Sequence, residues 1–275
     1  MSKIVMLDAG HGGHDSGAVG NGLREKDLTL RMALRVRDIL QQSYEGVIVR
    51  MTRTTDKYLS LAERTRMANN AKANYFFSFH INAGGGTGYE DFIWNKLATN
   101  SATDKSRQKV HNAVKPVLSK YGIRNRGMKK ANFHVLRETL MQAVLVETLF
   151  IDNANDAKLL KNNNFIEDIC QAYAKGIADV LGAKKKAAKP APTPKPTPTP
   201  NTSGKLYRVQ VGAYRVRSNA DNMLKQVKAK GFDGFVKYVN GLYKIQVGVY
   251  SVKANADAMK AKVEKAGFKA FITTE

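Results

Sequence analysis

The sequence is poor in cysteine, in long apolar runs and in acidic residues. Its single cysteine, Cys170, excludes an internal disulfide framework. The apolar neighbours of Cys170 lie at helical spacing and predict a buried thiol, not a nucleophile. No run approaches the roughly 18 apolar residues that a membrane span needs. The chain enters an apolar segment after its first three residues, without the features of a signal peptide. We therefore expect a protein that is made in the cytoplasm and has no membrane span.

The shortage of acidic residues leaves a large positive charge. Asp and Glu number 23 against 45 Lys and Arg, which gives a net charge of +22. The excess is +8 in residues 1–182, +5 in 183–204 and +9 in 205–275, so no single tail carries it. A field of this sign draws the chain toward polyanions, either nucleic acid or the anionic polymers of a cell wall.

Proline is concentrated in one stretch, where residues 190–200 hold six of the seven prolines. Such a run favours polyproline II and acts as an extended spacer; a ligand for an SH3 domain is the alternative. Before it, apolar strand-like runs alternate with helical patterns, which predicts an α/β domain whose mostly parallel sheet is flanked by helices. We expect three parts: the α/β domain at 1–182, a Lys/Pro/Thr-rich linker at 183–204 and a second domain at 205–275.

The second domain is an internal repeat. Residues 207–214 (Y-R-V-Q-V-G-A-Y) recur 36 positions later as residues 243–250 (Y-K-I-Q-V-G-V-Y). Each unit has the pattern strand, helix, strand, which predicts an α+β domain of split-βαβ type: a four-stranded antiparallel sheet with two helices behind it. RNA-recognition domains share this strand order. Residues 230–238 depart from their RNP1 motif by one inserted residue, so we expect no nucleic-acid binding.

Three polar residues of the first domain stand at the ends of apolar runs. His11, His80 and Glu147 occupy these positions. The runs are residues 4–7, 75–81 and 143–147. The pattern predicts a site on one rim of a sheet, where α/β folds place their ligands. Glu25 begins an amphipathic helical pattern, and alone it would indicate only a favourable charge at a helix start.

This set of residue types suits a hydrolytic metal site. Two imidazoles and a carboxylate are typical ligands of a catalytic zinc ion, with a fourth position left for water. A further carboxylate outside the ligands can accept the proton of that water and deliver it to a leaving nitrogen.

The segments that carry these residues resemble a known family. They are residues 8–18, 22–27, 78–82, 131–136 and 144–147. They resemble the zinc-dependent N-acetylmuramoyl-L-alanine amidases of the amidase-3 type, which cut peptidoglycan, over residues 1 to about 182. The resemblance implies that His11, Glu25 and His80 hold one zinc ion and that Glu147 is the catalytic carboxylate. The family usually has glycine two residues after that glutamate, where this chain has Leu149.

The repeat resembles a SPOR domain, the sporulation-related module that binds septal peptidoglycan. The resemblance covers residues 205–275 and rests on the two Q-V-G-x-Y motifs. It implies that one face of the sheet packs on the helices while the other is open to a glycan strand. The candidate glycan contacts are Gln210, Tyr214, Gln246 and Tyr250. In the first domain the candidate substrate contacts are Asn82, beside His80, and Arg126, in a basic segment (124–130) that we expect to be a solvated loop.

These features predict a peptidoglycan hydrolase that cleaves the amide between N-acetylmuramic acid and the L-alanine of the stem peptide. Its expected partners are peptidoglycan and the anionic polymers of the wall. Two alternatives stay open at this point: a zinc exopeptidase acting on stem peptides, and a non-catalytic basic protein that binds wall or nucleic acid. Without a signal peptide the enzyme would reach the wall after lysis or membrane permeabilisation, as phage endolysins and mother-cell lytic enzymes of sporulation do.

Overall fold

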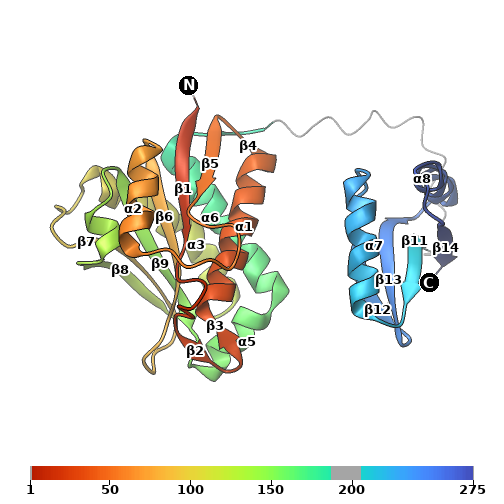
Figure 1. The fold of residues 1–275 in the computed structure, drawn as a ribbon, viewed down its shortest axis with the longest axis horizontal. Helices are drawn as coiled ribbons and strands as arrows, with labels where there is room; N and C mark the ends of the chain where they lie inside the picture. Colours follow the sequence, from red (N-terminus) through yellow and green to blue (C-terminus); the bar gives the residue numbers. More distant parts are fainter. Residues whose placement is uncertain (1, 187–205, 275) are drawn as a thin grey trace. The chain divides into compact units, whose positions relative to one another are not determined.

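The computed structural model describes residues 2–186 and 206–274 (Figure 1). Its contacts divide the chain into two units between residues 189 and 190. That division falls inside the predicted linker, most of which lies outside the described residues. The predicted domain boundaries stay predictions, although residues 184–185 form strand β10 (Lys184–Lys185) against β4 (Tyr44–Glu45) of the first unit. No helix among the described residues is long and apolar enough to cross a membrane.

A six-stranded sheet with the order β5-β1-β6-β9-β7-β8 forms the centre of the first unit. Its strands are β1 (Lys3–Ala9), β5 (Val47–Met51), β6 (Tyr75–Asn82), β7 (Tyr89–Trp94), β8 (Asn125–Ala131) and β9 (Gln142–Phe150). Every neighbouring pair is parallel except β7 with β9. The prediction of a mostly parallel sheet is therefore confirmed.

Helices cover both faces of this sheet (Figure 1). They are α1 (Glu25–Ser43), α2 (Leu61–Asn70), α3 (Ala102–Lys120), α4 (His134–Arg137), α5 (Ala154–Lys161) and α6 (Asn163–Leu181). The larger core lies between the sheet and α1, α3 and α6, while α2 and the single-turn α4 cover the other face. A short hairpin, β2 (Val19–Gly20) and β3 (Leu23–Arg24), leads into α1.

The alternation of side chains along the strands separates the core from the polar rim. In β6, Phe77 and Phe79 point into the larger core, so Ser78 and His80 point to the face that carries α2 and α4. His80 lies near the carboxyl end of β6, beside the carboxyl end of β1. This is the rim on which the sequence predicted a site.

One part of the first unit differs from the prediction. The basic segment 124–130 was expected to be a solvated loop, and this was wrong: residues 125–131 form the edge strand β8, paired with β7. The charged residues of β8 and Gly127 interrupt the apolar alternation by which a buried strand is recognised in a sequence. Lysines are common on edge strands because they discourage pairing with other chains.

The second unit has the predicted split-βαβ architecture. Its antiparallel sheet has the order β12-β13-β11-β14. The elements are β11 (Tyr207–Tyr214), α7 (Arg217–Ala229), β12 (Phe235–Val239), β13 (Leu242–Tyr250), α8 (Lys253–Lys265) and β14 (Phe271–Thr274). Val209 and Val211 of β11, with Ile245 and Val247 of β13, pack toward the two helices.

Leu149 produces a local departure from regular strand geometry. It is fully buried and has a φ of 69°, in the left-handed region that glycine adopts most easily. The register between β6 and β9 shifts there, because His80 pairs with Glu147 but Asn82 pairs with Phe150. The chain thus keeps the backbone conformation that a glycine would favour, with a leucine in its place.

We predict that Leu149→Gly is at least as stable as Leu149→Ala, the reverse of the usual order in a strand. Both variants lose a buried side chain, which costs about 2–5 kcal/mol. The Cβ of alanine in the left-handed region costs roughly 1–2 kcal/mol more, and glycine avoids it. Urea unfolding followed by the fluorescence of Trp94, the only tryptophan, measures the first unit.

The matched control is Val146, a buried residue of the same strand. There Val146→Gly should be less stable than Val146→Ala by roughly 0.5–1 kcal/mol. If glycine is also the less stable residue at position 149, the backbone at Leu149 is not under the strain described here.

Candidate functional site

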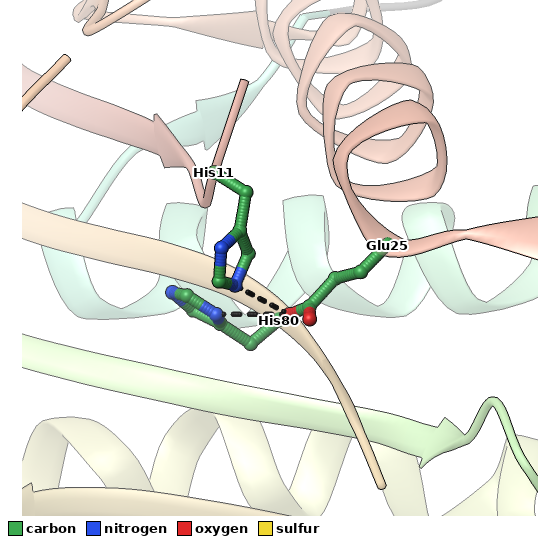
Figure 2. Close-up of side chains that lie close together, drawn as sticks. All are labelled: His11, Glu25 and His80. Carbon is green, nitrogen blue, oxygen red and sulfur yellow. Dashed lines mark hydrogen bonds and ion pairs between the residues drawn. The ribbon is translucent and has the colours of Figure 1, made fainter. Parts of the chain in front are cut away.

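Three side chains from distant segments converge at the end of β1 and β6. His11 lies in the loop after β1, His80 lies on β6 and Glu25 is the first residue of α1. Figure 2 shows the three pointing toward one another: Glu25 Oε1 is 3.1 Å from His11 Nε2 and 3.0 Å from His80 Nδ1. One ligand atom of each lies within 4.8 Å of the others. The structure therefore brings together the three residues that the sequence proposed as metal ligands.

The electrostatics of this cluster favour a positive charge at its centre. Burial opposes charge on both imidazoles, yet their hydrogen bonds to Glu25 outweigh it and raise the pKa of His11 and of His80. Burial likewise opposes the charge of Glu25, and the two histidines outweigh it and lower the pKa of that carboxyl. A group of donors that binds protons this strongly is also suited to a divalent cation.

Further hydrogen bonds fix the orientation of these donors. Asp15 Oδ2 lies 2.9 Å from His11 Nδ1, which leaves His11 Nε2 facing Glu25. Glu25 accepts hydrogen bonds from the backbone N–H groups of Ala18 and Ile81, at 2.9 Å each. A carboxylate behind a ligating imidazole, and donors behind a ligating carboxylate, are typical of protein metal sites.

Two buried arginines hold the loop that carries His11. Arg53 donates from Nε to the carbonyl of Ala9 at 2.9 Å and from Nη2 to that of Gly10 at 2.8 Å. Arg64 donates to the carbonyls of Ala9 at 2.6 Å and His11 at 2.7 Å. His11 itself has a φ of 61°. This left-handed backbone conformation costs free energy for any residue other than glycine. The arginine pair, Arg53 and Arg64, stabilises that conformation.

Asp8 balances the charge of this arrangement. It is 1% exposed and accepts hydrogen bonds from Arg64 at 2.9 Å, Thr52 at 2.8 Å and Ser78 at 2.7 Å. Burial raises the pKa of Asp8, but Arg64 and Ser78 outweigh it and hold the pKa below its ordinary value. Neither Asp8 nor the arginine pair stands out in the sequence, because nothing local shows that segments 43 to 70 residues apart meet.

Glu147 lies beside the ligand cluster. It pairs in register with His80, so both side chains lie on the same face of the sheet. Its Oε2 atom is buried and bonds to no described residue. Burial, reinforced by the charges of Glu25 and Glu90, raises the pKa of Glu147 to about 7. An unpaired buried carboxyl next to a candidate metal site is suited to proton transfer near neutral pH.

A small cavity opens beside the cluster. Its volume is about 80 Å³, and its lining includes His11 and His80 together with Tyr58, Leu61 and Val135. A cavity of this size, lined in part by imidazoles, has room for water and for a small part of a substrate.

The two candidate substrate contacts of the first unit meet at a residue that the sequence analysis missed. Asn82 donates to Glu90 Oε1 at 2.7 Å, and Arg126 donates from Nε to Glu90 Oε2 at 2.6 Å. Glu90 is 4% exposed. The sequence around Glu90 does not predict that it lies beside Asn82 and Arg126, because its position depends on the antiparallel register of β7 with β9.

The structure separates the four candidate glycan contacts of the second unit into two kinds. Gln210 and Gln246 pair with each other at the centre of the sheet. Tyr214 and Tyr250 are packed against the hydrophobic core instead, and their rings lie close to Gly212 and Gly248. The residues that bind glycan stay a prediction.

Two exposed aromatic residues flank the central glutamines. Phe235 pairs with Gln246 and Phe271 pairs with Gln210, so the four form one row across the sheet. The phenylalanine residues are 52% and 41% exposed. They are separated by 36 residues, the period of the repeat, and comparison of the two repeat units would have revealed them in the sequence.

Comparison with known proteins gives matches for both units. The family model described as N-acetylmuramoyl-L-alanine amidase matches residues 5–179, and the SPOR domain model matches residues 203–274, with an overlapping match at 172–238. The sporulation-specific N-acetylmuramoyl-L-alanine amidase of Bacillus subtilis (strain 168) is 42% identical over 232 residues, 84% of this chain and 83% of that protein. The endolysin of Bacillus phage SPP1 is 47% identical over 192 residues, 70% of each chain.

Solved structures give the same result for the first unit. The catalytic domain of CwlV, an N-acetylmuramoyl-L-alanine amidase from Bacillus (Paenibacillus) polymyxa var. colistinus, is similar with a TM-score of 0.61 and 38% identity. The match covers 66% of this chain and 99% of that one.

We predict that Arg64→Met lowers the free energy of unfolding of the first unit by about 3–5 kcal/mol, because it leaves the charge of Asp8 buried without its partner. It should also weaken metal retention by freeing the loop of His11. Urea unfolding followed by Trp94 fluorescence, with elemental analysis of the purified protein, measures both effects.

Arg66, an exposed residue of the same helix, provides the matched control. Arg66→Met should change stability by no more than about 0.5 kcal/mol. Arg64→Lys keeps a charge near Asp8, so its stability should lie between those of Arg64→Met and Arg66→Met. It replaces Arg64→Met in the comparison if that variant does not fold. Equal stability of the variants at 64 and 66 would contradict the role given to Arg64.

Proposed function

The chain belongs to the N-acetylmuramoyl-L-alanine amidase family of hydrolases, and from this premise we propose that it cleaves the amide between N-acetylmuramic acid and L-alanine of peptidoglycan with water activated by one zinc ion. The observation that carries the proposal is the convergence of His11, Glu25 and His80 beside an unpaired Glu147. The family match favours this bond over the peptide bonds that a zinc exopeptidase would cut.

The donors present fit zinc. Two imidazole nitrogens and one carboxylate form a ligand set typical of catalytic zinc sites. Asp15 fixes the tautomer of His11, and the backbone N–H groups of Ala18 and Ile81 orient Glu25. When bound, zinc lowers the pKa of water to about 7 and polarises a carbonyl oxygen.

Glu147 performs the proton transfers in this proposal. Its carboxylate accepts the proton of the attacking water and delivers it to the nitrogen of the departing L-alanine. Its position on β9, one strand from His80, places it next to the ligands without making it one of them. Its Oε2 atom is buried and bonds to no described residue, so the carboxyl is free of the hydrogen bonds that would hold its proton or its charge in place.

The second unit directs the enzyme to its polymeric substrate. SPOR domains bind septal peptidoglycan, and we assign this role to the face of the sheet that carries Phe235, Gln246, Gln210 and Phe271. Exposed aromatic rings stack on the apolar faces of sugars, and the partly exposed amide of Gln210 provides hydrogen bonds, whereas Gln246 is only 2% exposed. The charge of +9 in residues 205–275 adds attraction to anionic wall polymers.

We predict that two variants of the first unit differ in whether they retain zinc. Glu147→Gln should retain zinc and lose turnover by about 10²–10⁴-fold, because the amide cannot accept a proton. His80→Ala should lose zinc as well as activity. Elemental analysis with and without chelator measures the metal, and mass analysis of digested sacculi measures new amino-terminal alanine.

His14 offers the matched control for His80, since it lies on the same glycine-rich loop as His11 but stacks on Tyr58 instead of joining the cluster. His14→Ala should keep its zinc. Unchanged metal in His80→Ala would contradict the ligand set, and full turnover in Glu147→Gln would remove Glu147 from its role. Cleavage inside the stem peptide would exclude the proposed bond.

We predict that Phe271→Ala in the Glu147→Gln background weakens binding to purified sacculi by about fivefold or more, as expected when an exposed aromatic contact with the ligand is removed. Val216→Ala is the control, because Val216 is exposed at the start of α7 and outside the sheet. Co-sedimentation measures both, with RNA at matched salt as competitor. Equal binding by the two variants, or stronger binding to RNA, would contradict the assigned face.

A further inference from the structure

A row of polar side chains runs across the first sheet, away from the metal ligands. His80 of β6 pairs in register with Glu147 of β9, and Glu147 pairs with Glu90 of β7. Register partners on adjacent strands lie on the same face of a sheet. The row therefore continues from the candidate metal site through the catalytic carboxyl to Glu90, one strand at a time.

Glu90 holds two cations at the end of this row. Its Oε2 atom accepts hydrogen bonds from Arg126 Nε and Lys129 Nζ, and its Oε1 atom accepts one from Asn82. The side chain of Glu90 is 5% exposed, whereas those of Arg126 and Lys129 are 25% and 38% exposed. The carboxylate thus lies underneath, and the two cations form the surface that a substrate meets.

A bulge in β8 places both cations on the same face. Arg126 and Lys129 are three residues apart, and strict alternation would direct them to opposite faces of the sheet. The register with β7 shifts at this point, because Tyr89 pairs with Asn125 but Glu90 pairs with Gly127. Gly127 has a φ of 87°, which glycine adopts without strain. Bulges of this kind redirect side chains and are frequent beside active sites.

The charges of this cluster do not balance. One carboxylate faces two cations, which leaves a surplus of one positive charge. Neutralising Glu90 requires only one partner, and both cations are more exposed than the carboxylate they share, so their charge is available to a ligand at the surface. The guanidinium of Arg126 also lies 4.9 Å from the ring of Phe150, which holds its plane in place. An oriented guanidinium and a nearby ammonium are well suited to a carboxylate ligand.

The spacing fits a peptide substrate. Neighbouring strands lie about 4.8 Å apart, so β8 is roughly 10 Å beyond Glu147. An extended peptide advances about 3.3–3.6 Å per residue, so this distance corresponds to about three residues.

We propose that Arg126 and Lys129, held by Glu90, form a subsite for a free carboxylate of the stem peptide, about two to three residues beyond the scissile amide. The subsite rests on the proposed function, since it assumes that the amide is cut beside Glu147. It makes the enzyme selective between stem peptides whose carboxyl groups are free and those whose carboxyl groups are amidated.

The test uses the full-length, zinc-loaded protein and two soluble substrates, an N-acetylmuramoyl tripeptide with free carboxylates and the same compound with carboxamides in their place. Lys129→Gln and Arg126→Gln should each raise KM for the free acid by about tenfold or more, as expected for the loss of a charge-assisted hydrogen bond. The value of kcat should change little, because the contact is present in both ground and transition states. The amidated substrate should be insensitive to either change.

Lys130 is the matched control. It is the next residue of β8, its Nζ donates to the carbonyl of Leu97 at 2.7 Å, and Lys130→Gln removes the same charge from a different contact. This variant should leave KM for both substrates unchanged. Lys129→Arg should restore the preference for the free acid.

The outcomes separate this inference from the proposed function. An equal rise in KM for both substrates would show a structural role for the cluster and overturn the subsite. An effect of Lys130→Gln on KM equal to that of Lys129→Gln would also overturn it. If the unmodified protein releases no amino-terminal alanine from either substrate, the proposed function fails. If it cleaves both and the variants do not distinguish them, the subsite alone fails. Zinc content and unfolding followed by Trp94 show that each variant is folded.

Discussion

The site depends on buried hydrogen bonds from the arginine pair, Arg53 and Arg64, to the backbone of the loop after β1. A loop that turns a histidine inward with a left-handed backbone exposes carbonyl groups to the interior, and each would cost free energy if it were unpaired. Two guanidinium groups provide many donors at fixed angles and so satisfy several of these carbonyls at once. Asp8 then makes the buried charge of Arg64 tolerable. The backbone position of His11 is thus set by groups that never touch its ring, while Asp15 and Glu25 orient the ring itself.

Strand alternation explains why a single sheet can provide both a dry core and a polar site. Along β6 and β9, alternate residues fill the core beneath α1, α3 and α6, and the intervening ones lie on the face covered by short helices. The polar members of this alternation, His80 and Glu147, lie on that face, and Glu90 of β7 is next to Glu147. The chemistry therefore needs no special insertion, since it uses the face that the fold leaves thinly covered.

Much of this could be predicted from the sequence, and what could not be predicted has a common cause. His11, Glu25, His80 and Glu147 stand in local patterns, at the ends of apolar runs or at a helix start, so their segments could be recognised one at a time. Glu90 and the arginine pair owe their roles to partners far away along the chain. Segment 124–130 was mistaken for a loop because an edge strand with a bulge shows neither apolar alternation nor a buried run.

The environment of Glu147 follows from the register of β9 with its two neighbouring strands, β6 and β7. Towards β6 it faces the histidines, whose positive charge lowers its pKa, and towards β7 it faces Glu90, whose negative charge raises it. Arg126 and Lys129 offset much of the charge of Glu90, because they bind its carboxylate directly. Burial then becomes the main influence on Glu147, and burial acts on a carboxyl without holding its proton at a fixed place. In the proposed mechanism the base accepts a proton from water and releases it to nitrogen, which needs this freedom, and the sheet provides it by keeping every ion pair of the row one strand away from Glu147.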